Sequence, residues 1–167
     1  TLAGKIGTGW SGIEQLVGGA SADTFMFTNA GSITDSVIGG GGNDTLIGDD
    51  DGNAFNVTGA NSGTLATKVL AWTGIESLQG GAGDDSFALS GGTLTGTVNG
   101  AGGGNDSLQL GSVVGNLVTV TSLNSGTATG TGGFSNIENI TGSAANDDTF
   151  TLAGGTLSGT INGSGGS

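Results

Sequence analysis

The chain repeats itself at an interval of 62 positions, and this repeat constrains its fold more than any other feature of the sequence. An Ile-Glu pair recurs at that spacing, with an aromatic residue three positions before each Ile and Leu or Ile three positions after it. These positions are Trp10, Trp72 and Phe134; Ile13, Ile75 and Ile137; Glu14, Glu76 and Glu138; and Leu16, Leu78 and Ile140. The 167 residues hold about 2.7 copies (167/62) and are cut mid-repeat at both ends. We therefore predict one continuous domain over residues 1–167 in which neighbouring copies stack.

A shorter period lies inside the repeat. The step from Asp23 to Asp44 is 21 positions, the step from Asp85 to Asp106 is the same, and Asp148 follows Asp106 at twice that distance. This spacing predicts three coils of about 21 residues in each repeat. A unit this short cannot bury its apolar face alone, so each coil is expected to pack against the next.

The segments between these aspartates alternate apolar and polar residues, which is typical of short strands with one buried face. Phe25 and Phe27 flank Met26, for example, and Phe87 and Leu89 flank Ala88. The 39 glycines favour tight turns and disfavour helices, and the chain contains no proline. Crossovers between parallel strands are right-handed in nearly all proteins. The sequence therefore predicts an all-β fold, a right-handed parallel β-solenoid of the β-helix or β-roll type.

The composition excludes several classes of function. The chain contains no His, Cys or Arg, and its net charge is −12. It therefore lacks the imidazole and thiol groups that commonly serve as nucleophile, general base or zinc ligand. Its acidity repels nucleic acid and anionic lipid, and no apolar run approaches the ~20 residues of a membrane-spanning helix. We expect no enzyme, no nucleic-acid partner and no membrane span. A polysaccharide-active enzyme is the remaining catalytic alternative, with only Lys5 and Lys68 as cations.

One motif carries a specific chemical hypothesis. The pattern G-G-x-G-x-D-x-U-x, with U apolar, marks calcium-binding β-helix repeats. Residues 39–47 and 80–88 fit it fully, residues 101–109 lack the first glycine, and residues 18–26 and 143–151 fit in part. Glycines let turn carbonyls face inward, and aspartate adds the anionic oxygen that calcium prefers. The predicted calcium ligands and their glycines are Asp23, Asp44, Asp85, Asp106, Gly42, Gly83 and Gly104. The alternative is a purely structural turn in which each aspartate bonds its own backbone.

The motifs come in pairs, each pair separated by the shorter period and followed by a gap. We therefore expect the two turns of each pair to stack on neighbouring strands. Two carboxylates ~4.8 Å apart repel by roughly 3.5 kcal/mol at an effective dielectric constant of 20, which favours a cation between them. Such stacking in the second pair also predicts close backbone approach at Gly80, Gly81, Gly83, Gly102 and Gly104.

These nonapeptides resemble the hemolysin-type calcium-binding (repeats-in-toxin) family of secreted bacterial proteins. In that family the motifs run in tandem and calcium lies between stacked turns of a parallel β-roll, whereas here they come in pairs. The surrounding units, typified by residues 55–63 and 137–142, resemble large bacterial surface exoproteins built from β-strand repeats. Those proteins are grouped with filamentous hemagglutinin-like adhesins. The resemblance implies an extracellular or cell-surface location.

We expect the chain to be a structural or adhesive repeat segment, a stalk or fibre, of a large secreted bacterial surface protein. Its partners would be a continuation of the same solenoid or further copies that assemble into fibres, with a surface or a glycan as ligand. The alternative is a calcium-dependent folding module of a type I-secreted exoprotein, in which metal binding drives folding.

Several other features allow two interpretations each. The recurring aromatic residues could stack on sugars, but their fixed place in the repeat favours packing at a coil corner. The recurring glutamates suit an exposed strand position or a backbone cap. The acidic run at residues 49–51 favours a solvated turn over a ligand cluster. Thr-x-Thr runs such as residues 93–97 resemble flat ice-binding faces, but they do not persist between copies.

Overall fold

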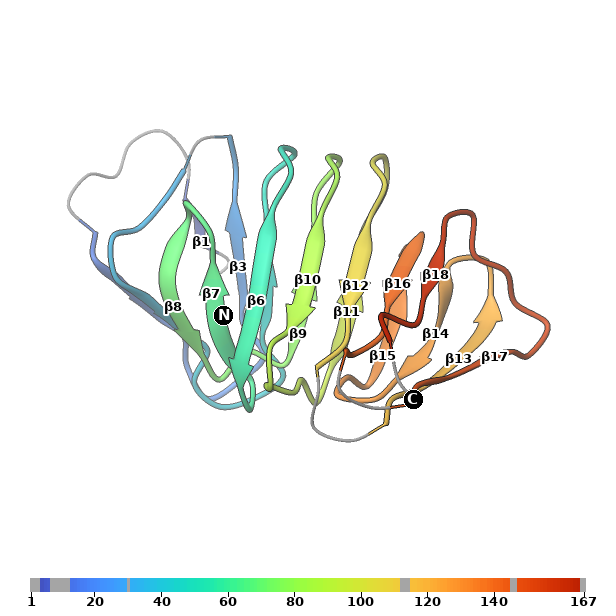
Figure 1. The fold of residues 1–167 in the computed structure, drawn as a ribbon. Coiled ribbons are helices and arrows are strands. Elements are labelled where there is room, and N and C mark those ends of the chain that lie inside the picture. The colour runs from blue at the N-terminus through green and yellow to red at the C-terminus, as the bar shows by residue number, and fades with distance from the viewer. Residues whose placement is uncertain (1–3, 7–12, 30, 112–114, 145–146, 166–167) are drawn as a thin grey trace.

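The protein is built from two broad β-sheets. A computed structural model describes residues 4–6, 13–29, 31–111, 115–144 and 147–165. These residues form 18 strands in two nine-stranded sheets and no helix, which confirms the predicted all-β class. No helix that could cross a membrane is therefore found among them. Figure 1 shows the strands advancing from the N-terminal side, where blue and green strands lie together, to the C-terminal side, in orange and red.

The strands of the two sheets are ordered in the same direction along the molecule. The first sheet has the order β1 (Gly4–Ile6), β3 (Thr24–Phe27), β5 (Thr45–Ile47), β9 (Ser77–Gln79), β11 (Thr97–Asn99), β15 (Gly133–Ser135), β14 (Ser125–Ala128), β13 (Leu117–Ser122), β17 (Thr149–Leu152). The second sheet has the order β2 (Gln15–Val17), β4 (Ser36–Ile38), β8 (Val69–Thr73), β7 (Ser62–Leu65), β6 (Ala54–Gly59), β10 (Ser86–Leu89), β12 (Ser107–Gln109), β16 (Asn139–Thr141), β18 (Ile161–Asn162).

The short period of the sequence is visible in the strand register. Strand β3 pairs in parallel with β5, with Phe25 opposite Leu46, and β10 pairs in parallel with β12, with Phe87 opposite Leu108. In both pairs the second residue lies one short period further along the chain than the first. Between two such strands the chain crosses to the other sheet and returns, so the predicted 21-residue step is confirmed at these places.

The sheets are nevertheless mixed, so the prediction of purely parallel strands in equal coils is wrong. Each repeat contains an antiparallel meander of three strands, β6–β8 in the second sheet and β13–β15 in the first. Across a meander the residues paired in parallel are further apart than one short period, 32 positions for Phe55 and Phe87 and 35 positions for Val37 and Trp72. The first hairpin of each meander contains Asn61 or Asn124, with φ of 47° and 52°. Asparagine tolerates this left-handed conformation, which reverses the chain within one sheet.

The meanders also make successive repeats exchange sheets. From β6 to β12 the chain changes sheet after the meander β6–β8 and after every following strand. With the meander counted as one visit, it makes five visits, which begin and end in the second sheet. Because the number of visits is odd, the next repeat begins in the first sheet with β13. The equivalent residues Trp72 and Phe134 consequently lie in opposite sheets. Repeat-equivalent side chains thus alternate between the two sides of the molecule.

The core lies between the sheets as one cluster of buried apolar side chains. The rings of Phe55 and Phe87 stack with centroids 4.9 Å apart and an interplanar angle of 7°. Burial of a side chain of this size stabilises the fold by ~1.5–3 kcal/mol. Trp72 and Phe134 are 1% and 4% exposed. The packing interpretation of the recurring aromatic residues is confirmed for these two, though within strands rather than at corners, while Trp10 lies outside the described residues.

Candidate functional site: the stacked aspartate turns

The predicted calcium ligands lie in turns that carry the chain from one sheet to the other. Asp23, Asp44, Asp85 and Asp106 each directly precede a strand, namely β3, β5, β10 and β12. Their exposed fractions are 8%, 0%, 1% and 2%, so all four carboxylates are buried at the edge of the core. Buried carboxylates require hydrogen bonds or a cation, which makes these turns the first candidate for a functional site.

The turns of each predicted pair stack on neighbouring strands. The backbone N–H of Asp23 donates to Oδ1 of Asp44 at 2.7 Å, and that of Asp85 donates to Oδ1 of Asp106 at 2.8 Å. The first pair connects the second sheet to the first, whereas the second pair connects the first sheet to the second. The two pairs therefore lie at opposite edges of the sheets. Figure 1 shows the turns that lead into β6, β10 and β12 side by side.

The same hydrogen bond extends beyond the predicted pairs into a ladder of backbone caps. Glu76 Oε2 accepts the N–H of Asp44 at 2.7 Å, and Glu138 Oε2 accepts the N–H of Asp106 at 2.8 Å. In each case an acidic side chain caps the residue that precedes the neighbouring strand. The backbone-cap interpretation of the recurring glutamates is therefore confirmed for Glu76 and Glu138.

Two asparagines in this ladder were missed by the sequence analysis. Asn53 donates to Asp85 Oδ1 through its backbone N–H at 2.7 Å and through Nδ2 at 2.9 Å, and Asn116 makes the same two bonds to Asp148. Each asparagine stands 32 positions before its aspartate and directly precedes a strand. Asp44 precedes Glu76 by the same interval, and this recurrence was the signal available in the sequence.

The second carboxylate oxygens differ among the aspartates. Oδ2 of Asp23 accepts the N–H of Gly19 at 2.6 Å, and Oδ2 of Asp85 accepts the N–H of Gly81 at 2.8 Å. Oδ2 of Asp44 is buried without a hydrogen-bond partner. An unsatisfied buried oxygen of this kind costs roughly 1–3 kcal/mol, and more when it is charged.

Burial and neighbouring charge perturb the titration of two aspartates in opposite directions. Burial raises the pKa of Asp106 to about 6. The hydrogen bond from the backbone N–H of Asp85 lowers this pKa in part, and the nearby acidic groups of Asp85, Glu138 and Asp84 raise it further. Burial also raises the pKa of Asp148, but the hydrogen bonds from Asn116 and Ser143 outweigh it and lower that pKa below 3.8.

The glycines of the motif allow backbone contact between stacked turns. A Cβ on Gly42 would lie 2.5 Å from the carbonyl carbon of Ser21, and one on Gly83 would lie 2.7 Å from that of Asp51. A Cβ on Gly104 would overlap the carbonyl oxygen of Gly83. An added Cβ at Gly80 would overlap Oδ2 of Asp85, and one at Gly81 would overlap the carbonyl oxygen of Asp49. The prediction of close approach is wrong at Gly102, where an added Cβ meets nothing within 4 Å.

The geometry therefore fits a hydrogen-bonded cap at Asp85 and leaves an unengaged oxygen at Asp44. Three N–H groups already occupy the carboxylate of Asp85, two from Asn53 and one from Gly81. Across the described segments, no group of three or more Asp, Glu, His or Cys side chains is arranged to hold a metal ion. A cation at these turns would take its oxygens from one or two carboxylates and from turn carbonyls.

The acidic run behaves differently from the prediction at its first residue. Asp49 is 3% exposed and forms an ion pair with Lys68, whose Nζ also donates to the carbonyl oxygen of Asn29 at 3.2 Å. The solvated-turn prediction is therefore wrong for Asp49, because Lys68 reaches it from the segment before β8. Asp50 and Asp51 are exposed as predicted.

Comparison with models of known protein families, with curated proteins and with solved structures gives no match.

We expect Gly81→Ala to lower the free energy of unfolding by about 1–3 kcal/mol, because the new Cβ overlaps the carbonyl of Asp49 and forces the stacked turns apart. Gly102→Ala is the matched control in the neighbouring turn and should change stability by less than about 0.5 kcal/mol. Urea unfolding measures both. Equal losses in the two variants would show that the turns are not held by backbone contact.

We expect Asp106→Asn to stabilise the protein at pH 7 by about 2–3 kcal/mol and to have little effect near pH 4. The pKa of Asp106 is raised from 3.8 to about 6 in the folded state, so its negative charge destabilises the fold fully above about pH 6. This cost decreases as the pH falls from about 6 to 3.8, because the folded protein then binds the proton that the unfolded chain still lacks. Asparagine keeps the acceptor for the N–H of Asp85 without the charge. Urea unfolding from pH 4 to pH 7, with Asp51→Asn as an exposed control, measures the difference. A difference that grows towards acidic pH would contradict the raised pKa.

Proposed function

We propose that the chain is a repetitive structural segment, a stalk or fibre, of a secreted bacterial surface protein with an adhesive role. In this proposal the two sheets are the faces of a right-handed β-solenoid that lengthens with every 62-residue repeat. The observation that carries it is the order of the strands. Outside the meanders, whose three strands run in the reverse order, both sheets grow in the same direction as the sequence advances, and repeat-equivalent layers follow one another along one axis.

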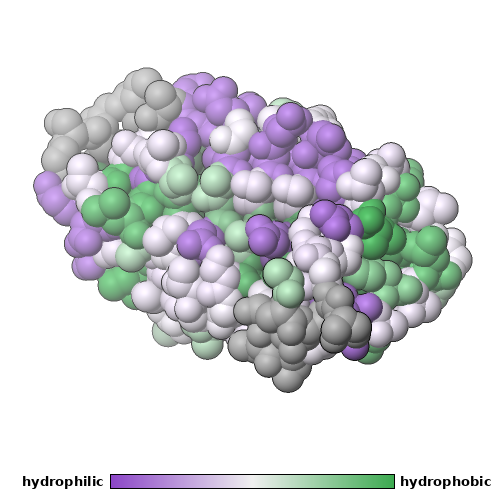
Figure 2. All heavy atoms as spheres, in the orientation of Figure 1, coloured by the Kyte–Doolittle hydropathy of each residue, from purple (hydrophilic) through white to green (hydrophobic). Residues whose placement is uncertain are grey.

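The exposed apolar side chains at the C-terminal end of the sheets support an extended assembly. Leu117, Leu123, Leu152 and Ile161 are 58%, 66%, 59% and 39% exposed, and they belong to the last strands or their connections. Figure 2 shows hydrophobic residues at this end, as well as at the opposite end, and hydrophilic residues over the turns. A further layer, from a continuing chain or a second copy, would bury this surface and pair the edge strands β17 and β18.

The chemistry of the chain also favours a structural role outside the cell. The sequence offers no imidazole, thiol or guanidinium, and its carboxylates serve largely as backbone caps in the stacked turns. A net charge of −12 keeps such a rod soluble and discourages non-specific association. Catalysis is not part of this proposal.

The rod hypothesis is tested by adding repeats. Each repeat contributes seven strands to two sheets, so proteins extended by one and by two further copies of the unit should each gain roughly 17 Å, or 3.5 layers of ~4.8 Å. Small-angle X-ray scattering should show this increase in maximum dimension at a constant cross-sectional radius. A cross-section that thickens with each added repeat would contradict the proposal.

A calcium-dependent folding module is the second candidate, and the buried Oδ2 of Asp44 favours it. That oxygen lacks a hydrogen-bond partner, and the charge on Asp106 is disfavoured by burial and by its acidic neighbours. A cation at each turn would relieve the cost at that turn, and turn carbonyls could complete an all-oxygen ligand set. Metal binding would then contribute directly to folding in the calcium-rich space outside the cell.

We expect millimolar calcium to raise the melting temperature relative to chelator if this second function holds. Calcium at 100 times its dissociation constant would stabilise the fold by about 2.7 kcal/mol. Asp44→Asn should reduce the calcium-dependent increase by the part that the Asp44 turn contributes, whereas Asp51→Asn, in an exposed turn position, should retain the full increase. Identical melting curves in calcium and in chelator would remove the metal from the function and leave the cap ladder as the whole role of these aspartates.

A further inference from the structure

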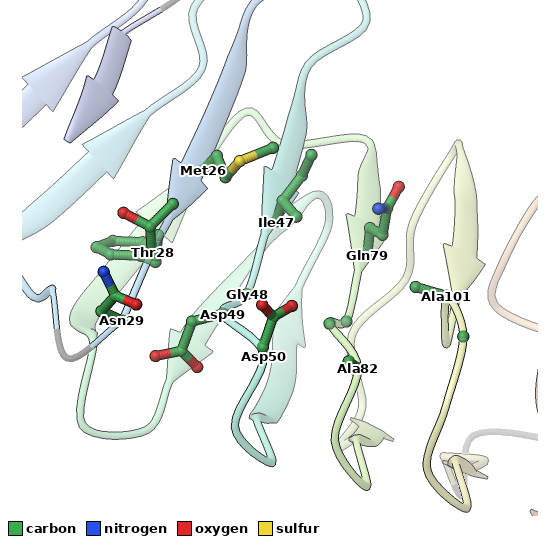
Figure 3. Close-up of a pocket in the computed structure, with 14 residues that line it drawn as sticks. Met26, Thr28, Asn29, Ile47, Gly48, Asp49, Asp50, Gln79, Ala82 and Ala101 are labelled. Carbon is green, nitrogen blue, oxygen red and sulfur yellow. The ribbon is translucent and has the colours of Figure 1, made fainter. Parts of the chain in front are cut away.

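Two open grooves lie at the carboxyl ends of the strands, one on each sheet. The larger, of about 520 Å³, crosses the ends of β3, β5, β9 and β11 in the first sheet, and Figure 3 shows Met26, Asn29, Asp49 and Gln79 along it. The smaller, of about 260 Å³, crosses the second sheet at the ends of β10 and β12 and the turn after β16. The larger volume falls within the ~300–1,000 Å³ that is usual for small-molecule sites.

The two grooves are the same feature of the repeat. Every residue that lines the smaller groove stands 62 positions after one that lines the larger. Met26 corresponds to Ala88, Ile47 to Gln109, and Gly81 to Ser143. Because successive repeats exchange sheets, the grooves open on opposite sides of the molecule. A groove that recurs with the repeat is encoded by the sequence of the unit rather than by one local irregularity.

Each groove contains a buried polar atom without a partner. Oδ1 of Asp49 and Oγ of Ser143 make no hydrogen bond, and both residues are only 3% exposed. Lys68 neutralises Asp49 through the other carboxylate oxygen. What remains on Asp49 is an acceptor that needs a hydroxyl or amide donor, and on Ser143 a hydroxyl that can donate and accept. Each unmade hydrogen bond costs roughly 1–3 kcal/mol, which a ligand could recover.

We propose that the two grooves bind a neutral, hydroxyl-rich ligand, a short run of neutral polysaccharide, once per repeat. This inference rests on the adhesive role proposed above and names its ligand class. Sugar hydroxyls would donate to Asp49 in one groove and bond Ser143 in the other, and the amides of Gln79 and Gln109 add further partners. The apolar side chains of the lining, such as Met26 in the larger groove, offer a surface to the C–H faces of the rings.

The chemistry of the grooves disfavours the other ligand classes. A peptide strand would need an unpaired sheet edge, but β3, β5, β9 and β11 each have a neighbouring strand on both sides. Nucleic acid and acidic glycans would be repelled by the net charge of −12. A cation in the larger groove would meet a carboxylate, that of Asp49, which Lys68 already neutralises, and the described lining of the smaller groove contains no carboxylate.

The test is an NMR titration of the whole ¹⁵N-labelled chain with neutral tetrasaccharides of glucose, galactose, mannose and N-acetylglucosamine. Tetragalacturonate and calcium chloride, each alone, serve as the acidic and cationic comparisons. With at least one neutral sugar at up to about 10 mM, which detects millimolar dissociation constants, we expect amide shifts at residues of both grooves. The side-chain amides of Gln79 and Gln109 should shift with them.

Matched variants separate the grooves. Gln79→Ala should weaken binding by up to about tenfold in the larger groove only, and Ser143→Ala should do so in the smaller groove only. Ser143→Ala should leave the melting temperature unchanged or raise it, because it removes an unsatisfied buried hydroxyl. Gln15→Ala and Ser122→Ala, exposed and outside both grooves, should bind as the parent does.

Three outcomes would overturn the inference: no shifts with any neutral sugar, shifts confined to other surfaces, or equal binding of tetragalacturonate. Shifts in the grooves with calcium alone would reassign them to a cation and overturn it as well. None of these results bears on the length increase per added repeat, so the rod proposal and the ligand proposal fail separately.

Discussion

The structure depends on one recurring contact, in which a side chain placed just before a strand caps the backbone of the layer before it. Asp44, Asp106, Glu76 and Glu138 each accept the N–H of the residue that precedes the neighbouring strand. Glycine is needed in the same turns because the stacked backbones touch, as at Gly104 over Gly83. The contact fixes the register at the edge of each layer, so the apolar side chains of successive strands coincide in the core. A fold with few large side chains is thereby held by repetition.

This contact also explains how an acidic chain buries so many carboxylates. A carboxylate that accepts several N–H bonds keeps its charge at little cost, and Asp148 shows the resulting fall in pKa. Where a like charge lies close and burial dominates, as at Asp106, the pKa rises instead. The ladder therefore contains carboxylates whose charge is stabilised by hydrogen bonds and carboxylates whose burial is costly. The costly positions are Asp106 and the unpartnered oxygen of Asp44, and a cation would stabilise the fold most at these two.

The repeat also determines on which side of the molecule each unit lies. Because each unit visits the two sheets an odd number of times, units alternate between the sides of the molecule. The aspartate pairs therefore lie at opposite edges, and the two grooves open on opposite sheets. A ligand that bound once per repeat would be presented on alternating sides of the molecule at a spacing of roughly 17 Å, which is 3.5 layers of ~4.8 Å. That arrangement suits multivalent adhesion to an extended polymer.

The sequence by itself determined the strand class, the 62-residue unit, the 21-residue pairing of Phe87 with Leu108 and the stacking of Asp85 on Asp106, because these follow from periodicity and from the turn chemistry of glycine and aspartate. It did not reveal the meanders, since an antiparallel hairpin and a crossover share the same alternation of apolar residues, and the left-handed asparagines of the hairpins, Asn61 and Asn124, have counterparts such as Asn136 outside any hairpin. The role of Asn53 in the ladder, the burial of Asp49 against Lys68 and the two grooves were decided by tertiary structure. Each of these joins residues that are distant in sequence, and their proximity depends on which sheet the chain enters after a meander.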